Sequence, residues 1–269
     1  MKRKRLRGAL AGCVLFVSLL AASGARAQAP QASAGGLAPG APGRDAQWES
    51  AGKQGVGTSN TLESNVWFTL RDGVMTEVYF PTVDIANSRL LQFVVVSENG
   101  RRVETESDDA HHKIELLDPQ SLTYRQTNTA KSGRWTITKT YVSDPARPVV
   151  LIDVEFKGSG GESLYVYYDP ALNNSGMHDS AWTHGAEDSS AERGGALLAS
   201  DGDKGSALVF GPRPAGRMGK FLSDTNGYFG TSDGLMELKR AGRLQRTYVR
   251  AADGNVVQVA QIPLEHPDA

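Results

Sequence analysis

From Trp48 onward, short runs of β-branched and aromatic residues follow one another along the chain, separated by turn signals. This succession is typical of an all-β sandwich or barrel. Arg71, Asp72 and Gly73 separate the first two runs and predict a hairpin. The expected strands are 65–70, 74–80, 90–97, 113–118, 121–129, 134–142, 149–156, 163–169, 196–200, 206–210, 219–223, 246–250 and 255–264.

Two of these runs also predict how their faces are buried. The run that begins at Arg134 alternates between two sets of residues, which predicts one buried and one wetter face. The two sets are Trp135, Ile137, Lys139 and Tyr141, and Thr136, Thr138, Thr140 and Val142. The run that begins at Val149 is more continuously apolar, so we expect a strand that is covered on both faces.

One short helix is expected at 234–243. Ser232 and Asp233 can cap its start, and Leu235 and Leu238 lie on one side of it. With at most one or two short helices, the predicted fold class is all-β.

The first 27 residues have the form of a signal peptide. A basic start and an apolar stretch precede Ala25-Arg26-Ala27, which has the small-x-small form of a signal peptidase site. The apolar stretch is too short to favour a permanent transmembrane helix. We therefore expect export to the periplasm or the medium, with no membrane contact after the signal is removed.

Leu10-Ala11-Gly12-Cys13 also matches a lipoprotein box, whose cysteine would be acylated. Because the apolar run continues beyond Cys13 to Ala22, we expect ordinary cleavage after Ala27 instead. The mature chain would then contain no cysteine, and therefore no disulfide, thiol nucleophile or cysteine metal site.

The charge balance argues against nucleic-acid binding. The formal net charge is −1, but the first 27 residues hold six basic residues and no acidic one. Without them, 23 basic residues remain against 30 acidic ones. A protein that binds nucleic acid needs the opposite balance.

The rest of the chain divides by composition. Residues 28–46 are mainly Ala, Pro, Gly and Ser and form a flexible or surface-hugging lead-in, because they lack the apolar bulk that would offset the cost of ordering. The β domain covers 47–264, and 265–269 is a tail.

A long polar excursion at 169–194 interrupts the strand pattern, and loops of this kind often carry function. An aromatic ring with nearby amides and carboxylates suits sugar recognition. The same residues also suit turns, or contact with a neighbouring domain. The candidates are Asp169, Asn173, Asn174, His178, Asp179, Trp182 and His184, with Glu187 and Asp188 beyond them. None is expected to be catalytic.

The sequence does not define a set of metal ligands. His178, Asp179 and His184 do not have a recognised metal-ligand spacing, whereas Asp and Asn oxygens could hold calcium, so metal binding stays open. No other cofactor is expected. Asp108 and Asp109 with His111 and His112 form a short charged cluster between strands, which we expect to be a solvated turn.

Several segments resemble the N-terminal domain of bacterial glucoamylases and glucodextranases, which belong to glycoside hydrolase family 15. They follow in the family's order from about residue 40 to 264. These segments are GAPG (40–43), GVGTSNTLESNVWFTLRDGVMTEVYFPTVDIANSRLLQF (55–93), KTYVSDPARPVVLIDVEF (139–156), YDPALNNSG (168–176) and TSDGLMELKRAGRLQRTYVRAADGNVVQVAQI (231–262).

The resemblance implies a large antiparallel β-supersandwich, similar to the galactose-mutarotase fold, placed before a helical α/α toroid. In that family the two catalytic glutamates of an inverting glucan 1,4-alpha-glucosidase or glucodextranase lie in the toroid. This chain stops at Ala269, where the linker should begin. We therefore expect it to be inactive alone, with the toroid supplied by another chain or lost by truncation.

Two other functions stay open. One is a freestanding module that binds glycans such as α-glucan. The other is a mutarotase-like sugar isomerase, which needs a carboxylate base and a histidine acid. Fold analogy is a weak basis for the second. The histidines do not form strand-centred pairs in the expected layout; they are His111, His112, His178, His184 and His266.

Overall fold

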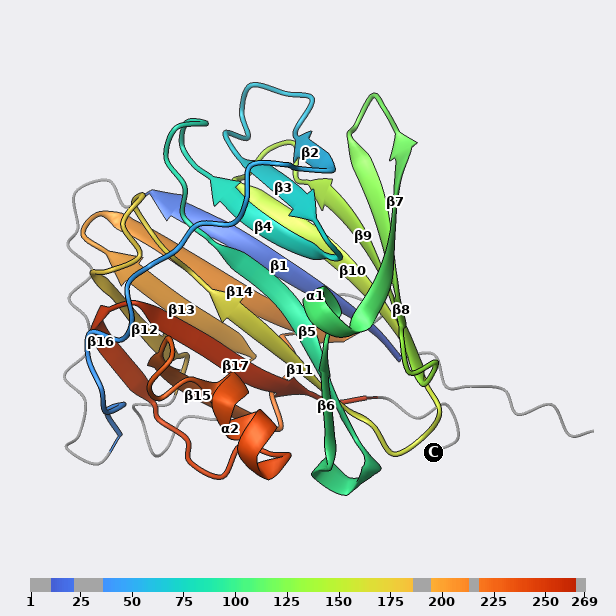
Figure 1. Cartoon of the computed structure of the whole chain (residues 1–269). Coiled ribbons are helices and arrows are strands. Elements are labelled where there is room, and N and C mark those ends of the chain that lie inside the picture. The colour runs from blue at the N-terminus through green and yellow to red at the C-terminus, as the bar shows by residue number, and fades with distance from the viewer. Residues whose placement is uncertain (1–10, 22–35, 186–194, 213–217, 265–269) are drawn as a thin grey trace, which may run out of the picture.

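Two antiparallel β-sheets packed face to face form the protein (Figure 1). The computed structural model describes residues 11–21, 36–185, 195–212 and 218–264. The strands are β1 (Ala11–Ala21), β2 (Gly55–Thr58), β3 (Trp67–Arg71), β4 (Val74–Tyr79), β5 (Leu90–Ser97), β6 (Arg102–Thr105), β7 (Ala110–Asp118), β8 (Thr123–Ala130), β9 (Trp135–Ser143), β10 (Val149–Gly158), β11 (Ser163–Asp169), β12 (Asp179–Thr183), β13 (Ala196–Asp201), β14 (Lys204–Pro212), β15 (Ser223–Tyr228), β16 (Arg250–Gly254) and β17 (Val256–Ile262). The helical elements are η1 (Glu98–Gly100), α1 (Glu106–Asp109) and α2 (Gly234–Ala241). The predicted all-β class is confirmed.

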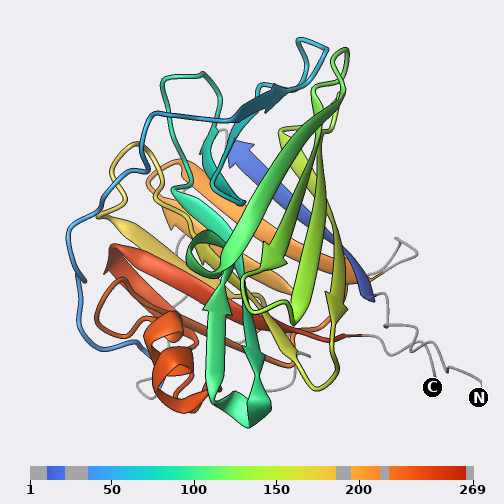
Figure 2. The same ribbon diagram turned by 45° about the vertical axis from the view of Figure 1, so that its right-hand side comes forward.

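The larger sheet has nine strands in the order β16-β12-β13-β14-β1-β10-β9-β8-β7. The smaller sheet has the order β15-β17-β11-β5-β4-β3-β2, and β6 adds to β5. Figure 2 brings β7 and β8, at one free edge of the larger sheet, toward the viewer. We refer to the two as the nine-stranded sheet and the smaller sheet.

The main core lies between the sheets, because the strands alternate inward apolar residues with outward ones. On β9 the predicted alternation is confirmed: Trp135, Ile137, Lys139 and Tyr141 are buried, and the threonines between them are half-buried. The ring of Tyr141 stacks on Phe68 of β3 with 5.8 Å between ring centroids, which joins the two sheets.

The prediction for the next strand is wrong. In β10, buried residues such as Val150 and Ile152 alternate with half-buried ones such as Leu151 and Asp153. The strand is therefore covered on one face only. Its outward residues are apolar in part, but no second layer packs over them among the described residues.

Local signals located the β3–β4 hairpin and the helix. Asp72 and Gly73 have positive φ angles of 44° and 82°, as a tight turn requires. Asp233 caps α2 by accepting a hydrogen bond from the Leu235 amide at 2.8 Å. The helix lies on the outer side of the smaller sheet, where its Leu238 packs on a second apolar cluster.

The sequence pattern did not predict several of the short strands. β2, β6 and β12 were not expected, and β12 lies inside the predicted long loop. β15 begins at Ser223, where the predicted strand 219–223 ends, and β16 overlaps the predicted strand 246–250 only at Arg250. These strands are short or polar, so their burial depends on neighbours far away in the sequence.

Residues 11–21 of the expected signal peptide are an internal strand, β1, paired with β10 and β14. Residues 1–10 and 22–35 lie outside the described residues, as does the tail 265–269. The described part of the lead-in lies against β15 and β16. There, the Ala38 amide donates to Arg250 and the Arg44 amide donates to Phe229. In the described ranges, the structure contains no helix with the length and apolar character to cross a membrane.

Candidate functional site

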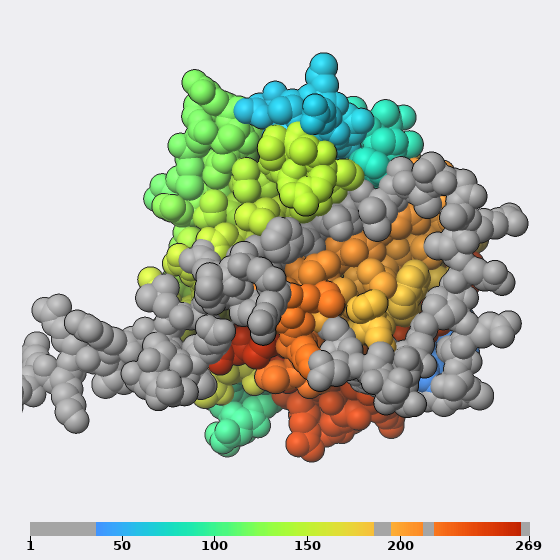
Figure 3. Space-filling model, turned by 180° about the vertical axis from the view of Figure 1, so that it is seen from behind, coloured from blue at the N-terminus to red at the C-terminus, as the bar shows by residue number. Residues whose placement is uncertain are grey.

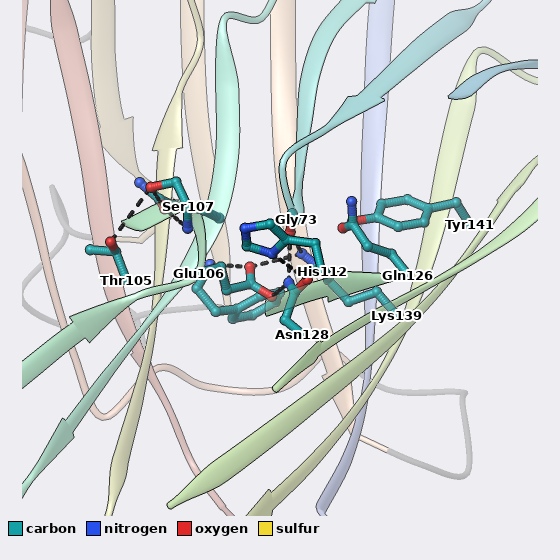
Figure 4. Close-up of polar contacts among 11 residues, drawn as sticks. Gly73, Thr105, Glu106, Ser107, His112, Gln126, Asn128, Lys139 and Tyr141 are labelled. Carbon is teal, nitrogen blue, oxygen red and sulfur yellow. Dashed lines mark hydrogen bonds and ion pairs between the residues drawn. The ribbon is translucent and has the colours of Figure 1, made fainter. Parts of the chain in front are cut away.

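A buried ion pair lies between the two sheets beside α1 (Figure 4). The Lys139 ammonium of β9 lies 2.8 Å from a carboxylate oxygen of Glu106 in α1, and both side chains are fully buried. The Phe93 amide of β5 donates to the same oxygen at 2.7 Å. The Asn128 side chain of β8 donates to the other oxygen. One carboxylate therefore connects both sheets and α1.

The turn between β3 and β4 completes this network. The Gly73 carbonyl accepts hydrogen bonds from Lys139 and from Asn128, each at 2.7 Å. A Cβ at this position would lie 2.3 Å from Nδ1 of His112, and φ is +82°. Glycine is thus required both by the backbone angle and by the close approach of the histidine.

The buried charges are well compensated. The Lys139 ammonium also lies 5.7 Å from the ring centroid of Phe93 and 5.9 Å from that of Tyr141. Burial lowers the pKa of Lys139, and the Glu106 carboxylate opposes this shift. Burial raises the pKa of Tyr141, whose hydroxyl donates to Gln126 at 3.0 Å. Because internal partners engage these groups, the network can hold the sheets together but is not free to bind a substrate.

A shallow cavity of about 400 Å³ lies next to this network at the open edge of the sandwich. It is lined by Gln54, His112, Ile114, Leu116 and Tyr124. Nδ1 of His112 lies 3.2 Å from Oδ1 of Asn128, so the cavity touches the buried network through one side chain. A ring, an amide and an imidazole suit a small polar ligand with an apolar face.

The turn expected at Asp108, Asp109, His111 and His112 is wrong, although Asp108 and His111 are exposed to solvent as expected. Asp108 and Asp109 belong to α1, and His111 and His112 already belong to β7. His112 points to Asn128 and not to a carboxylate (Figure 4). The described residues therefore do not give this histidine the acid–base partner that sugar isomerisation needs.

Asp169 is fully buried at the end of β11. Nε of Arg89 donates to it at 2.8 Å, and the same guanidinium donates to Glu49 at 2.7 Å. Burial raises the pKa of Asp169, and Arg89 opposes this shift. The Arg89 guanidinium also lies 5.2 Å from the ring centroid of Phe229. Asp169 thus anchors the segment before β5.

Asn173 and Asn174 form a turn with positive φ angles of 55° and 60°. The Asn174 side chain accepts from the Ala86 amide at 2.7 Å and donates to the Asp84 carbonyl at 2.8 Å. The Asn173 amide donates to the side chain of Asn87 at 3.1 Å. Both asparagines therefore fasten the turn after β11 to the segment after β4.

Asp179 is a buried acid at the start of β12. Its two carboxylate oxygens accept from the Leu172 amide at 3.0 and 3.3 Å. Burial raises its pKa from 3.8 to about 8, the Leu172 hydrogen bond opposes this, and Asp201 and Asp169 add to it. The Asp179 carboxyl group therefore holds a proton at neutral pH.

The other three candidates lie at the surface, apart from the Figure 4 network. His178 forms an exposed pair with Asp253 at 3.1 Å. Trp182 is half-buried in β12, opposite Leu198 of β13 and Arg250 of β16, and His184 is exposed just beyond the strand. Figure 3 shows this outer side of the nine-stranded sheet, with β12 in yellow and β13 and β14 in orange. Glu187 and Asp188 lie outside the described residues.

Sequence reasoning missed the residues of the buried network. Lys139 carried a signal, because it occupies the same face of its run as Trp135, Ile137 and Tyr141. Glu106 and Asn128 carried none, because only the fold brings them to Lys139. Among the described residues, no group of three or more His, Cys, Asp or Glu side chains is placed to hold a metal ion.

Fold and site together define a large two-sheet antiparallel β-sandwich domain with a buried ion pair between its sheets. A sequence model of the family described as glucodextranase, domain N, matches residues 38–269. The glucoamylase of Clostridium sp. (strain G0005) is 32% identical over 234 residues, covering 83% of this chain and 30% of the relative. A crystal structure of a bacterial glucoamylase complexed with acarbose matches with a TM-score of 0.69 and 28% identity, covering 92% of this chain and 34% of that one.

The chain belongs to the glucodextranase domain N family. The expected resemblance is confirmed. The chain spans about a third of the length of each of these two relatives.

Replacing Lys139 by Met should cost ~3–5 kcal/mol of unfolding free energy, because it leaves the Glu106 carboxylate buried without its cation. The double variant Lys139→Met with Glu106→Gln should regain part of this loss. Urea unfolding followed by circular dichroism measures both. Lys113→Met, on the exposed outer face of β7, is the control. A loss below ~1 kcal/mol in the single variant would contradict the role of the pair.

Asp179→Asn should flatten the pH dependence of stability. The folded chain keeps a proton on Asp179 up to about pH 8, whereas an acid with the ordinary pKa of 3.8 has lost it. Between these two values, Asp179 lowers the stability of the unmodified chain as pH rises, by up to ~1.4 kcal/mol per pH unit.

The Asp179→Asn variant should therefore be the more stable form at pH 9, and the difference should shrink toward pH 4. Urea unfolding at pH 4, 6, 7.5 and 9 tests this, with the exposed Asp45→Asn as control. A difference that does not change with pH would show that Asp179 is ionised in the folded chain.

Proposed function

We propose that this chain is an exported, non-catalytic domain that supports an α-glucan-hydrolysing toroid domain in carbohydrate metabolism. The observation that carries the proposal is the partial match. The match to a glucoamylase covers 83% of this chain but only 30% of the length of that enzyme. Most of the relative, by this reasoning including the toroid, has no counterpart in the described residues.

The hydrogen bonds of the buried acids favour a structural role for this domain over a catalytic one. Inverting hydrolysis needs two carboxyl groups roughly 6.5–9.5 Å apart across a cleft that admits a sugar. Glu106, Asp169 and Asp179 are instead enclosed by internal donors. Their chemistry serves the fold, so we assign the cleavage step to the partner.

We assign the contact with the partner to the outer side of β12. Trp182 supplies a half-buried ring there, and His184 lies beside it at the end of the strand. Half-buried aromatic residues often make the anchoring contacts of protein interfaces. Asp169, Asn173, Asn174 and Asp179 act indirectly, because they hold the segment that leads into β12.

The purified chain should release no glucose from maltooligosaccharides or dextran. It should bind the part of the Clostridium glucoamylase that lies outside the matched region, measured by calorimetry. Trp182→Ala should weaken this binding by about tenfold or more. Met236→Ala, exposed on α2 across the molecule, is the matched control. Glucose release by the chain alone would overturn the proposal.

A freestanding glycan-binding module is the second candidate, and the cavity beside His112 favours it. Tyr124 offers a ring for stacking, and Gln54 and His112 offer polar groups for hydroxyls. In this case maltooligosaccharides should bind the chain without any partner. Tyr124→Ala should abolish binding at the cavity, whereas loss on Trp182→Ala would place the sugar on β12. Ligand-observed NMR detects such weak binding.

A further inference from the structure

The strand β1 occupies the middle of the nine-stranded sheet. It pairs with β10 from Ala11 opposite Phe156 to Ser18 opposite Val149. On its other side it pairs with β14 from Cys13 to Ala21, and both pairings are antiparallel. β10 and β14 are not paired with each other. Among the described strands, the segment 11–21 is therefore the one that hydrogen-bonds to both halves of this sheet.

The same segment is the apolar centre of the expected signal peptide. If residues 1–27 are removed, β10 and β14 remain two strand spacings apart, about 9.6 Å. This separation is too wide for direct hydrogen bonds. Each strand would then present a row of unpaired N–H and C=O groups inside the sheet, which is costly.

The two halves cannot easily close this gap, because the half made of β16, β12, β13 and β14 is bonded to the smaller sheet. The Gln258 side chain of β17 donates to the Leu198 carbonyl of β13 at 3.2 Å. The Tyr168 hydroxyl of β11 donates to Ser206 of β14 at 3.0 Å. Leu208 of β14 lies in the core between the sheets. A shift by one strand spacing would break all of these contacts.

The strand register defines the length, direction and side-chain pattern that a strand between β10 and β14 needs. Positions 13, 15 and 17 lie opposite Val154, Ile152 and Val150, the core-facing residues of β10. The same face continues on β14. The strand therefore needs about eight or nine extended residues with apolar side chains at alternate positions, running antiparallel to both neighbours.

We propose that the space between β10 and β14 is an acceptor site for a donated strand, occupied in the precursor by 11–21 and, after cleavage, by an extended segment of the toroid domain. This rests on the proposed function. β1 is the first element of the described residues, so its removal breaks no connection between the other described strands. A second processed copy would carry the same gap, and its described strands would already be paired within its own two sheets, whereas the matched glucoamylase has additional polypeptide. Strand addition of this kind uses main-chain hydrogen bonds for affinity and alternate side chains for specificity.

The test begins with the full chain, carrying a specific protease site between residues 28 and 35. The folded chain is cut, the leader is released, and hydrogen exchange of β10 and β14 is measured by mass spectrometry. Protection should fall by about 100-fold on release. It should return with a synthetic 11–21 peptide carrying a lysine tail. The same peptide with Leu15→Pro, which cannot pair on both sides, should not restore it.

The occupant is tested by competition. The part of the Clostridium glucoamylase outside the matched region should displace a fluorescent 11–21 peptide from the cut chain. Binding without displacement would overturn the assignment of the strand but leave the proposed function standing, whereas a failure to bind would contradict both.

Three other results would also overturn the proposal. One is unchanged protection of β10 and β14 after the leader is released, which would mean that the gap closes by itself. Another is a strand-exchanged dimer, seen by light scattering, which would make a second copy the occupant. The third is unfolding of the cut chain that neither the peptide nor the unmatched part of the Clostridium glucoamylase prevents.

Discussion

The Glu106 carboxylate accepts hydrogen bonds from three elements of the fold, and Lys139 brings a fourth group, the Gly73 carbonyl, into the same contact. Apolar packing between the sheets is non-directional and would tolerate small shifts between them. A buried ion pair does not, because a small displacement leaves a charge or an amide without its partner. We infer that this pair fixes how the sheets sit on each other, and with it the position of the β3–β4 turn and of His112.

Local sequence determined what could be predicted of the fold. The β3–β4 hairpin follows from Asp72 and Gly73, and α2 follows from the Asp233 cap, because both signals act within a few residues. β15 gave no such signal: Asp224 and Asn226 are polar, yet both are fully buried through bonds to Thr183 of β12. A strand whose burial depends on polar partners 41 and 43 residues away carries no apolar pattern of its own.

The same limit applies to the candidate site. Asp and Asn residues suit sugar hydroxyls, calcium ions and tight turns equally well. The sequence alone could therefore identify the seven candidate residues as a group, but it could not separate those that hold the fold from those that face outward. The structure places Asp169, Asn174 and Asp179 in contacts that hold the chain and leaves Trp182 and His184 facing outward. Lys139 could have been noticed as the charged member of an apolar face, but its partner could not.

The position of Ala11–Ala21 in the sheet has a consequence for the proposed export. A signal segment has to be accessible when a translocase captures it, and here residues 13–18 of the same segment are paired on both edges once the sheet has formed. If this segment directs secretion, a molecule that folds in the cytoplasm makes its own signal segment inaccessible. The fraction of molecules exported then depends on the rate of capture relative to the rate of folding. A chaperone that delays the pairing of β1 with β10 and β14 would increase this fraction.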